Sequence, residues 1–253
     1  FSDAPPDFES YLGSSILPFY DRMFDGRKLR LLGTSRQRIG ANWKLILENI
    51  KDPYHASLLH VFFVTFGLFR VDNPSQVITD SSKLHTALTS QRGKQELNDG
   101  TSQMRSFNSS LKLQGPELLD VEKEYAGDLT VVMQTIWPNL ILQQQSNSLA
   151  CRQVIPTGPE SFELHWTFFG YETDSDELTE RRLRQANLMG PGGLVSMDDS
   201  EVVARIQDGI RHKDDSAGIV EMGGLGTETQ TDHMVTEVAI RAFYEGYRKV
   251  MDL

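Results

Sequence analysis

Side chains of the kinds that bind metals are concentrated in residues 42–60: Glu48, Asn49, Asp52, His55 and His60. His55 and His60 are five residues apart, so on a regular helix they point in directions that differ by roughly 140°. Zinc peptidases place two histidines four residues apart, which puts both rings on one helix face. The pair here can converge on one ion only if the helix widens locally, as in a π-bulge. Pro53 favours such a distortion because it removes an amide donor.

A metal held by two histidines needs a further ligand from elsewhere in the chain. Two histidines and one carboxylate leave coordination positions open for dioxygen and substrate. Asp198 and Asp199 supply a remote carboxylate, although an Asp pair that begins a helix also serves as an N-cap. The simpler interpretation of the histidines is one core residue and one surface residue.

The segment 42–60 resembles the catalytic domain of the α subunits of Rieske-type aromatic-ring-hydroxylating oxygenases. The family pattern is Asn-Trp-Lys, then Glu-Asn, then Asp-x-Tyr-His-x-x-x-x-His, and all of it is present. The similarity extends to residues 135–139, 190–193, 198–209 and 239–244. Within the family the chain is most similar to enzymes that act on carboxylated aromatics, such as salicylate hydroxylases, anthranilate dioxygenase and terephthalate dioxygenase.

This resemblance implies a mononuclear Fe(II) site. Its ligands would be His55, His60 and Asp199, with Asp198 pointing outward or capping a helix. The implied activity is hydroxylation of an aromatic acid with dioxygen, using electrons from a Rieske [2Fe–2S] cluster and, through a reductase or ferredoxin, from NAD(P)H.

Two further residues receive roles from the resemblance. Asp52 would orient His55 and carry electrons between the iron of one subunit and the Rieske cluster of its neighbour. Asn49 would face the iron. The alternatives are a surface or helix-capping carboxylate for Asp52 and a buried amide bonded to backbone for Asn49.

Two arginines are candidates for binding the substrate. Arg152 interrupts an apolar strand sequence, residues 149–155, and a buried guanidinium needs an anion. A substrate carboxylate, an internal acid or solvent on the outer face of the sheet would each satisfy it. Arg241 is a weaker candidate, since the family carries an arginine there regardless of substrate. Cys151 is interpreted as a packed apolar residue.

Composition excludes several classes of function. The chain has 253 residues and a net charge of −10, from 25 basic and 35 acidic side chains, which argues against nucleic acids and anionic membranes as partners. No apolar run reaches the length of a spanning helix, and no signal peptide opens the sequence, so a cytoplasmic location is expected. One cysteine excludes an internal disulfide and a cysteine-based cluster.

The domain organisation follows from the single cysteine and the resemblance. A Rieske domain holds its cluster with two Cys and two His, which this chain lacks, so we expect the cluster only in a longer protein. Residues 1–33 would be a linker and approach segment that follows an absent Rieske domain, and residues 34–253 the catalytic domain. The family further implies a homotrimer, α3 or α3β3, with a possible small β subunit.

Pattern and breakers predict an α+β domain of the helix-grip (START/Bet v1-like) type, an antiparallel sheet with long helices around the iron pocket. Helices are expected at 40–61, 174–189, 196–210 and 231–251. Strands are expected in 76–91 around a turn at 80–82, at 129–137, 140–156 and 161–171, and in 62–69 after an irregular start. Residues 92–128 would form a long excursion.

Two other functions remain to be weighed. One is a non-catalytic helix-grip module that binds a small apolar ligand, which the intact His and Asp set argues against. The other is a zinc hydrolase, which is disfavoured because no Glu adjoins His55 to act as a base.

Overall fold

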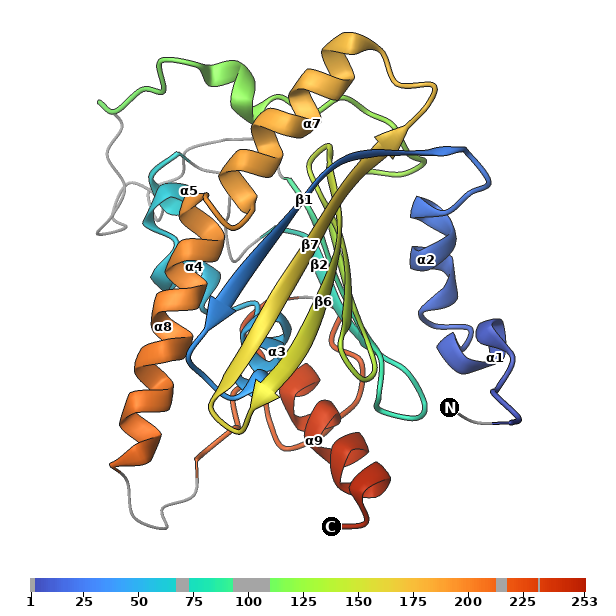
Figure 1. Cartoon of the computed structure of the whole chain (residues 1–253), viewed down its shortest axis with the longest axis vertical. Helices are drawn as coiled ribbons and strands as arrows, with labels where there is room; N and C mark the ends of the chain where they lie inside the picture. The colour runs from blue at the N-terminus through green and yellow to red at the C-terminus, as the bar shows by residue number, and fades with distance from the viewer. Residues whose placement is uncertain (1–2, 67–72, 93–109, 213–217, 232) are drawn as a thin grey trace.

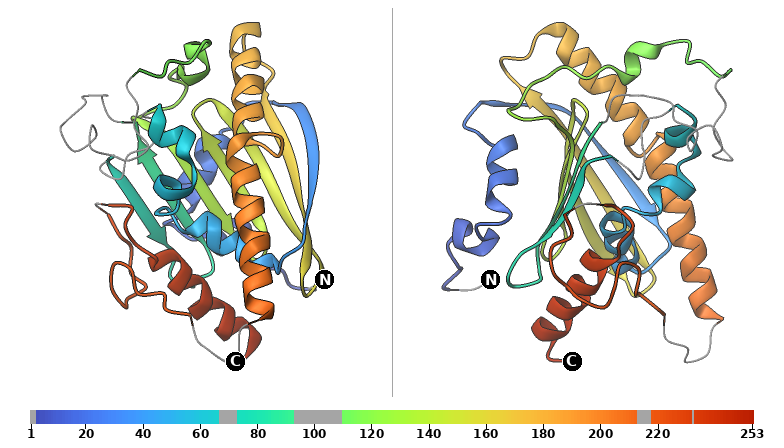
Figure 2. Two further views of the ribbon diagram at one scale, coloured as in Figure 1. Left: turned by 90° about the vertical axis from the view of Figure 1, so that its left-hand side faces the viewer. Right: turned by 180° about the vertical axis from the view of Figure 1, so that it is seen from behind.

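The computed structural model describes residues 3–66, 73–92, 110–212, 218–231 and 233–253. A single antiparallel sheet of seven strands forms the middle layer, in the order β1-β7-β6-β5-β4-β3-β2. Helices α1 and α2 lie on one side of this sheet, and α3, α4, α5, α8 and α9 lie on the other (Figures 1 and 2). This arrangement confirms the predicted α+β class.

The strands are β1 (Leu29–Ile39), β2 (Ser75–Thr79), β3 (Thr86–Gln91), β4 (Leu129–Ile136), β5 (Leu140–Gln145), β6 (Ser148–Gly158) and β7 (Ser161–Tyr171). The predicted single strand 140–156 is wrong, because a turn at Ser146 and Asn147 folds it into the β5–β6 hairpin. Ser146 has a φ of 55°, so this turn uses the left-handed region of backbone conformation. No glycine stands at this position to indicate the turn in the sequence.

The helices are α1 (Phe8–Leu12), α2 (Leu17–Met23), α3 (Trp43–Lys51), α4 (Ala56–Leu59), α5 (Val61–Thr65), α7 (Asp176–Met189), α8 (Leu194–Arg211) and α9 (Val238–Met251), with a 3₁₀ turn η1 (Pro116–Leu119). Residues 62–65 belong to α5, so the strand expected there is wrong, and its remainder at 67–69 lies outside the described residues. Part of the expected excursion, residues 93–109, also lies outside them.

Strand β1 starts before residue 34, the expected start of the catalytic domain. It pairs along β7 from Leu29↔Tyr171 to Ile39↔Phe162, so the sheet begins inside the segment 1–33 that was predicted as a linker. Three arginines and exposed positions on both faces hide the alternation that usually identifies a strand.

The two larger apolar clusters of the described residues hold the layers together. One packs Ile46 and Leu47 of α3, Val203 of α8 and Phe243 of α9 against the sheet. The other packs residues of α1, α2 and the segment between them against the opposite face. The first core fixes α3 and α8 over the same face of the sheet. Within the described residues, no helix combines the length and apolarity needed to cross a membrane.

Candidate metal centre

An interruption of the helix between α3 and α5 brings the two histidines together. Asn42 caps α3 by accepting a hydrogen bond from the Lys44 amide, as expected, but the helix ends at Lys51. His55 precedes the short helix α4, and His60 lies between α4 and α5 with a non-helical backbone (φ −87°, ψ 76°). The predicted π-bulge is therefore wrong: a full interruption beginning at Asp52 and Pro53 replaces it, because proline disfavours helical backbone at the residue before it.

The remote carboxylate comes from α8. Ser196, Asp199, Val203 and Gln207 are buried at helical spacing, so one stripe of α8 faces the sheet and α3. The Gln207 side chain accepts a hydrogen bond from the Asn42 amide at 2.8 Å, which ties α8 to the start of α3.

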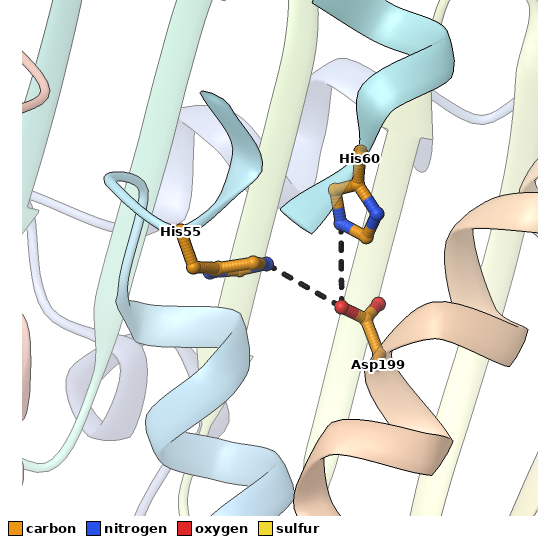
Figure 3. A group of neighbouring side chains, drawn as sticks. All are labelled: His55, His60 and Asp199. Atoms are coloured by element: carbon orange, nitrogen blue, oxygen red, sulfur yellow. Dashed lines mark ion pairs between the residues drawn. The ribbon is translucent and has the colours of Figure 1, made fainter. Parts of the chain in front are cut away.

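His55, His60 and Asp199 converge on one point (Figure 3). Asp199 Oδ1 lies 3.4 Å from His55 Nε2 and 3.3 Å from His60 Nε2. One ligand atom from each residue can be chosen so that all lie within 4.8 Å of one another. The structure thus brings together the three residues predicted as ligands, and the ligand role itself stays a prediction.

Charge is tightly coupled inside this group. Burial lowers the pKa of His55, but the hydrogen bonds and charges of Asp199 and Asp52 outweigh burial and raise that pKa to about 9. Burial raises the pKa of Asp199, whereas its contacts with His55 and His60 hold it far below the usual range. Without a bound cation, His55 is therefore protonated at neutral pH beside an ionised Asp199. A cation that binds here must displace the His55 proton.

The outward-facing nitrogens of both histidines also have partners. His55 Nδ1 donates to the Asp52 backbone carbonyl at 2.5 Å, while the Asp52 carboxylate is farther away, at 3.7 Å. His60 Nδ1 lies 3.3 Å from Asp198 Oδ2. Asp198 lies inside α8, whose N-cap is Gly193, so the expected capping role is wrong. Both rings are oriented from behind, as in metal sites generally.

Asn49 completes the inner wall of the site. Its Nδ2 donates to Asp199 Oδ1 at 3.1 Å and lies 3.4 Å from His55 Nε2. The alternative of an amide bonded to backbone is therefore wrong. Its Oδ1 is buried and has no hydrogen-bond partner in the described part of the chain, which leaves an acceptor free for a molecule bound at the site.

A mostly apolar cavity of about 100 Å³ adjoins the three residues. An engineered cavity that holds one benzene ring has a volume of about 150 Å³, so the cavity here is smaller but of the same order. The cavity wall includes Asn49, Asp52, His55, His60 and Asp199 together with apolar side chains from α5, β3, β4 and α8.

Arg152 lies on the sheet wall of this cavity with only 4% of its surface exposed. Its Nη2 contacts Met133 Sδ at 2.8 Å, its guanidinium carbon lies 4.6 Å from the Trp166 ring centroid, and its Nε has no partner among the described residues. Burial lowers the pKa of Arg152 to about 10, with the Asp199 charge acting in the opposite direction, so the group is cationic at neutral pH. The alternative that solvent on the outer face of the sheet satisfies Arg152 is therefore wrong.

Arg241 has a different surrounding. It donates to the backbone carbonyls of Gly226, Val220 and Met222, and it does not line the cavity. Its contacts hold the segment before α9 in place. The structure therefore does not support the predicted role of Arg241 in substrate binding, and we do not carry that role forward.

Several polar cavity residues were not anticipated: Ser90, Arg92, Gln143 and Gln145. The alternation of the strands 140–145 and 148–158 could have indicated that Gln143 and Gln145 share the face of Arg152, but the missed hairpin obscured it.

Two histidines, of which His60 is buried and His55 is partly buried, and one buried carboxylate lie beside a mostly apolar cavity in a helix-grip fold. This combination is typical of the class of mononuclear non-heme iron oxygenases. Residues 24–253 match the family described as the ring hydroxylating alpha subunit (catalytic domain), and the chain belongs to that family.

Relatives with curated descriptions are similar over nearly the whole chain. The large oxygenase component of salicylate 5-hydroxylase from Ralstonia sp. is 50% identical, over 96% of this chain and 58% of the relative. The anthranilate 1,2-dioxygenase large subunit from Burkholderia cepacia is 41% identical, over 99% and 60%. The terephthalate 1,2-dioxygenase terminal oxygenase component subunit alpha 2 from Comamonas sp. is 39% identical, over 99% and 61%. The chain thus spans about three fifths of the length of these relatives.

Solved structures share the fold. Naphthalene 1,2-dioxygenase from Rhodococcus sp., bound to indole, superposes with a TM-score of 0.68 at 21% identity, over 97% of this chain and 62% of that one. A quaternary ammonium Rieske monooxygenase gives a TM-score of 0.68 at 14% identity, over 98% and 57%. These similarities support the helix-grip architecture.

Proposed function

We propose that this chain is the catalytic domain of an oxygenase that hydroxylates the ring of a carboxylated aromatic compound with dioxygen at a mononuclear Fe(II). One observation carries the proposal: His55, His60 and Asp199 meet at the wall of an apolar cavity that also contains the buried, incompletely paired Arg152. The similarity to salicylate, anthranilate and terephthalate enzymes supports the choice of an aromatic acid.

The donor set fits iron. Two imidazole nitrogens and one carboxylate oxygen, 3.3–3.4 Å apart in their closest pairs, match ligands gathered on one side of a single ion. The unpartnered Asn49 Oδ1 beside them fits a centre whose remaining positions are filled by small molecules. Bound Fe(II) would supply the dioxygen and one-electron chemistry that no side chain provides.

The residues of this chain would supply position and environment. The Asp52 carbonyl and the Asp198 carboxylate fix the tautomer and direction of the two imidazoles. Asn49 holds the Asp199 carboxylate in place through its amide hydrogen. Apolar side chains such as Phe63 and Val195 exclude water from the ring.

Arg152 would hold the substrate carboxylate. A guanidinium presents a planar set of donors that matches a carboxylate, and a hydrogen bond between two charged groups is strongest where water is excluded. Anchoring the acid group at Arg152 would leave the ring between the sheet wall and the three metal-binding residues, which all line the same cavity.

Asp52 would link this site to its electron supply. Its side chain is 25% exposed and accepts a hydrogen bond from the Tyr54 amide. The carboxylate makes no close hydrogen bond to His55, so it can face a neighbouring subunit. We infer that electrons come from a Rieske [2Fe–2S] cluster on that neighbour, in a homotrimer with or without a β subunit, and reach the cluster from NAD(P)H through a reductase or ferredoxin.

The proposal is tested with the full-length protein, its reductase and NADH under ¹⁸O₂, offered a panel of benzoic acids. The expected result is a hydroxylated aromatic acid that carries ¹⁸O, and no product from the His60→Ala variant. Tight binding of aromatic acids without any labelled product would favour a ligand-binding module instead.

A further inference from the structure

The sheet wall of the cavity carries two buried polar atoms of opposite hydrogen-bonding type that no described residue satisfies. Arg152 Nε is a donor and Gln143 Oε1 is an acceptor, and neither has a partner in the described part of the chain. Both residues line the cavity, and they are 4% and 3% exposed. Buried polar atoms without a partner are rare because they have lost their hydrogen bonds to water. Because both residues also line the cavity, a ligand bound there can supply the missing partners.

Strand register places the two residues near each other. Arg152 on β6 lies opposite Ile141 on β5, and Gln143 lies two residues farther along β5, on the same face. Diagonal neighbours of this kind have backbone positions roughly 7–8 Å apart, within reach of long side chains. Met133 on β4 lies opposite Gln143, and its sulfur contacts Arg152 Nη2. One small molecule can thus reach both groups.

The Gln143 amide is oriented by its neighbour. Its Nε2 donates to Gln145 Oε1 at 2.7 Å, and Gln145 lies on the same face because both residues belong to β5 and are two apart. This contact engages an N–H of the Gln143 amide, whereas its carbonyl oxygen has no partner among the described residues. The unfilled requirement at this position is a hydrogen-bond donor.

We propose that Gln143 is a specificity-determining residue that accepts a hydrogen bond from a hydroxyl or amino group next to the carboxylate on the substrate ring. The substrate class is then an ortho-hydroxy or ortho-amino aromatic acid, with the carboxylate at Arg152. This inference rests on the proposed function. A plain benzoate leaves Gln143 Oε1 unsatisfied, and a para substituent points across the ring, away from the edge that Arg152 and Gln143 share.

The test compares ligands that differ only in the group beside the carboxylate. Full-length protein loaded anaerobically with Fe(II) is titrated by calorimetry with salicylate, anthranilate, 2-methylbenzoate and 4-hydroxybenzoate. Salicylate or anthranilate should bind roughly 5- to 10-fold more tightly than 2-methylbenzoate, the net effect of one neutral hydrogen bond. 4-Hydroxybenzoate should gain no such advantage.

Gln143→Met keeps the length of the side chain and removes the amide. In this variant the preference for the ortho donor should fall to about onefold, with 2-methylbenzoate affinity within roughly threefold of wild type. Gln153→Met is the matched control, because Gln153 is exposed on β6 and lies on the other face of the sheet. This control should keep the wild-type preference.

The outcomes separate this inference from the proposed function. An undiminished preference in Gln143→Met, or equal binding of all four acids to wild type, would overturn the role of Gln143 while leaving an aromatic-acid oxygenase intact. Failure of every acid to bind wild-type protein would instead contradict the proposed function. If Gln143→Met does not fold, Gln143→Leu, which also removes the carbonyl acceptor, should lose the ortho preference, and a preserved preference in that variant would count against the proposal.

Discussion

Arg152→Met separates a substrate anchor from a core residue, because the two roles predict opposite patterns. The substitution keeps a long side chain and removes the charge. Arg152 is 4% exposed, and its guanidinium contacts the Met133 sulfur and the Trp166 ring. Without a carboxylate partner, the buried charge costs desolvation energy, so the free energy of unfolding of the ligand-free protein should stay within about 1 kcal/mol of wild type or rise.

Affinity for aromatic acids should change strongly in the same variant. A hydrogen bond to a charged group contributes about 1.5–3 kcal/mol, which corresponds to a Kd increase of about 10- to 150-fold for benzoate. Benzyl alcohol, which carries no charge, should lose less than about threefold. The assays are urea unfolding of the apoprotein and anaerobic calorimetry of the Fe(II) form. Arg205→Met, at an exposed ion pair with Glu201 on α8, serves as the control and should change neither quantity. A variant that loses several kcal/mol of stability yet binds benzoate normally would refute the anchor role.

Three further predictions concern the metal centre and its electron supply. The raised pKa of His55 means that the folded chain keeps this proton to higher pH than the unfolded chain, so its stabilisation is present below about pH 6.5 and is lost toward about pH 9. The unfolding free energy of metal-free wild type relative to His55→Gln should therefore fall by at most roughly 3 kcal/mol between these limits. Only this difference between the two proteins is diagnostic. Burial lowers the pKa of Lys51 to about 7, which makes both proteins more stable over the same pH range. Asp52→Asn should retain iron by metal analysis, because the backbone carbonyl that holds His55 is unchanged, while turnover of the full-length enzyme falls more than about 100-fold; a wild-type rate of iron reduction by a pre-reduced cluster would sink the bridge role. The 253-residue chain mixed with a reductase and an aromatic acid should give no steady turnover, since one cysteine cannot supply a Rieske cluster, and sustained product formation would show another electron route.

The predicted elements succeeded where the chain shows a clear period and clear breakers. Strand 161–171 was predicted with its observed bounds, and the hairpin before it was marked by Gly158 and Pro159. Strand β1 was missed because it is an edge strand with polar residues on both faces, so tertiary pairing with β7 decides its structure. The turn at Ser146 was missed for lack of a glycine or proline.

The site was predictable as a set of residues but not as a geometry. His55, His60 and Asp199 were identified from residue type and family pattern, and they lie together. That pattern could not show that the helix ends before Asp52. It also could not show that the Asp52 backbone carbonyl, rather than the Asp52 carboxylate, makes the closer contact with His55. It also could not find Gln143, because a glutamine in a polar strand becomes significant only when its burial and missing partner are known.

The central claim is that His55, His60 and Asp199 hold one iron ion, and anaerobic Fe(II) titration followed by metal analysis tests it most directly. Wild type should bind one iron per catalytic domain, and His55→Ala, His60→Ala and Asp199→Ala should each bind none at the same concentration. Asp198→Ala should still fill its site, with affinity weakened by about 10- to 100-fold, because Asp198 contacts only the outer nitrogen of His60. Full iron in Asp199→Ala together with none in Asp198→Ala would contradict the assignment.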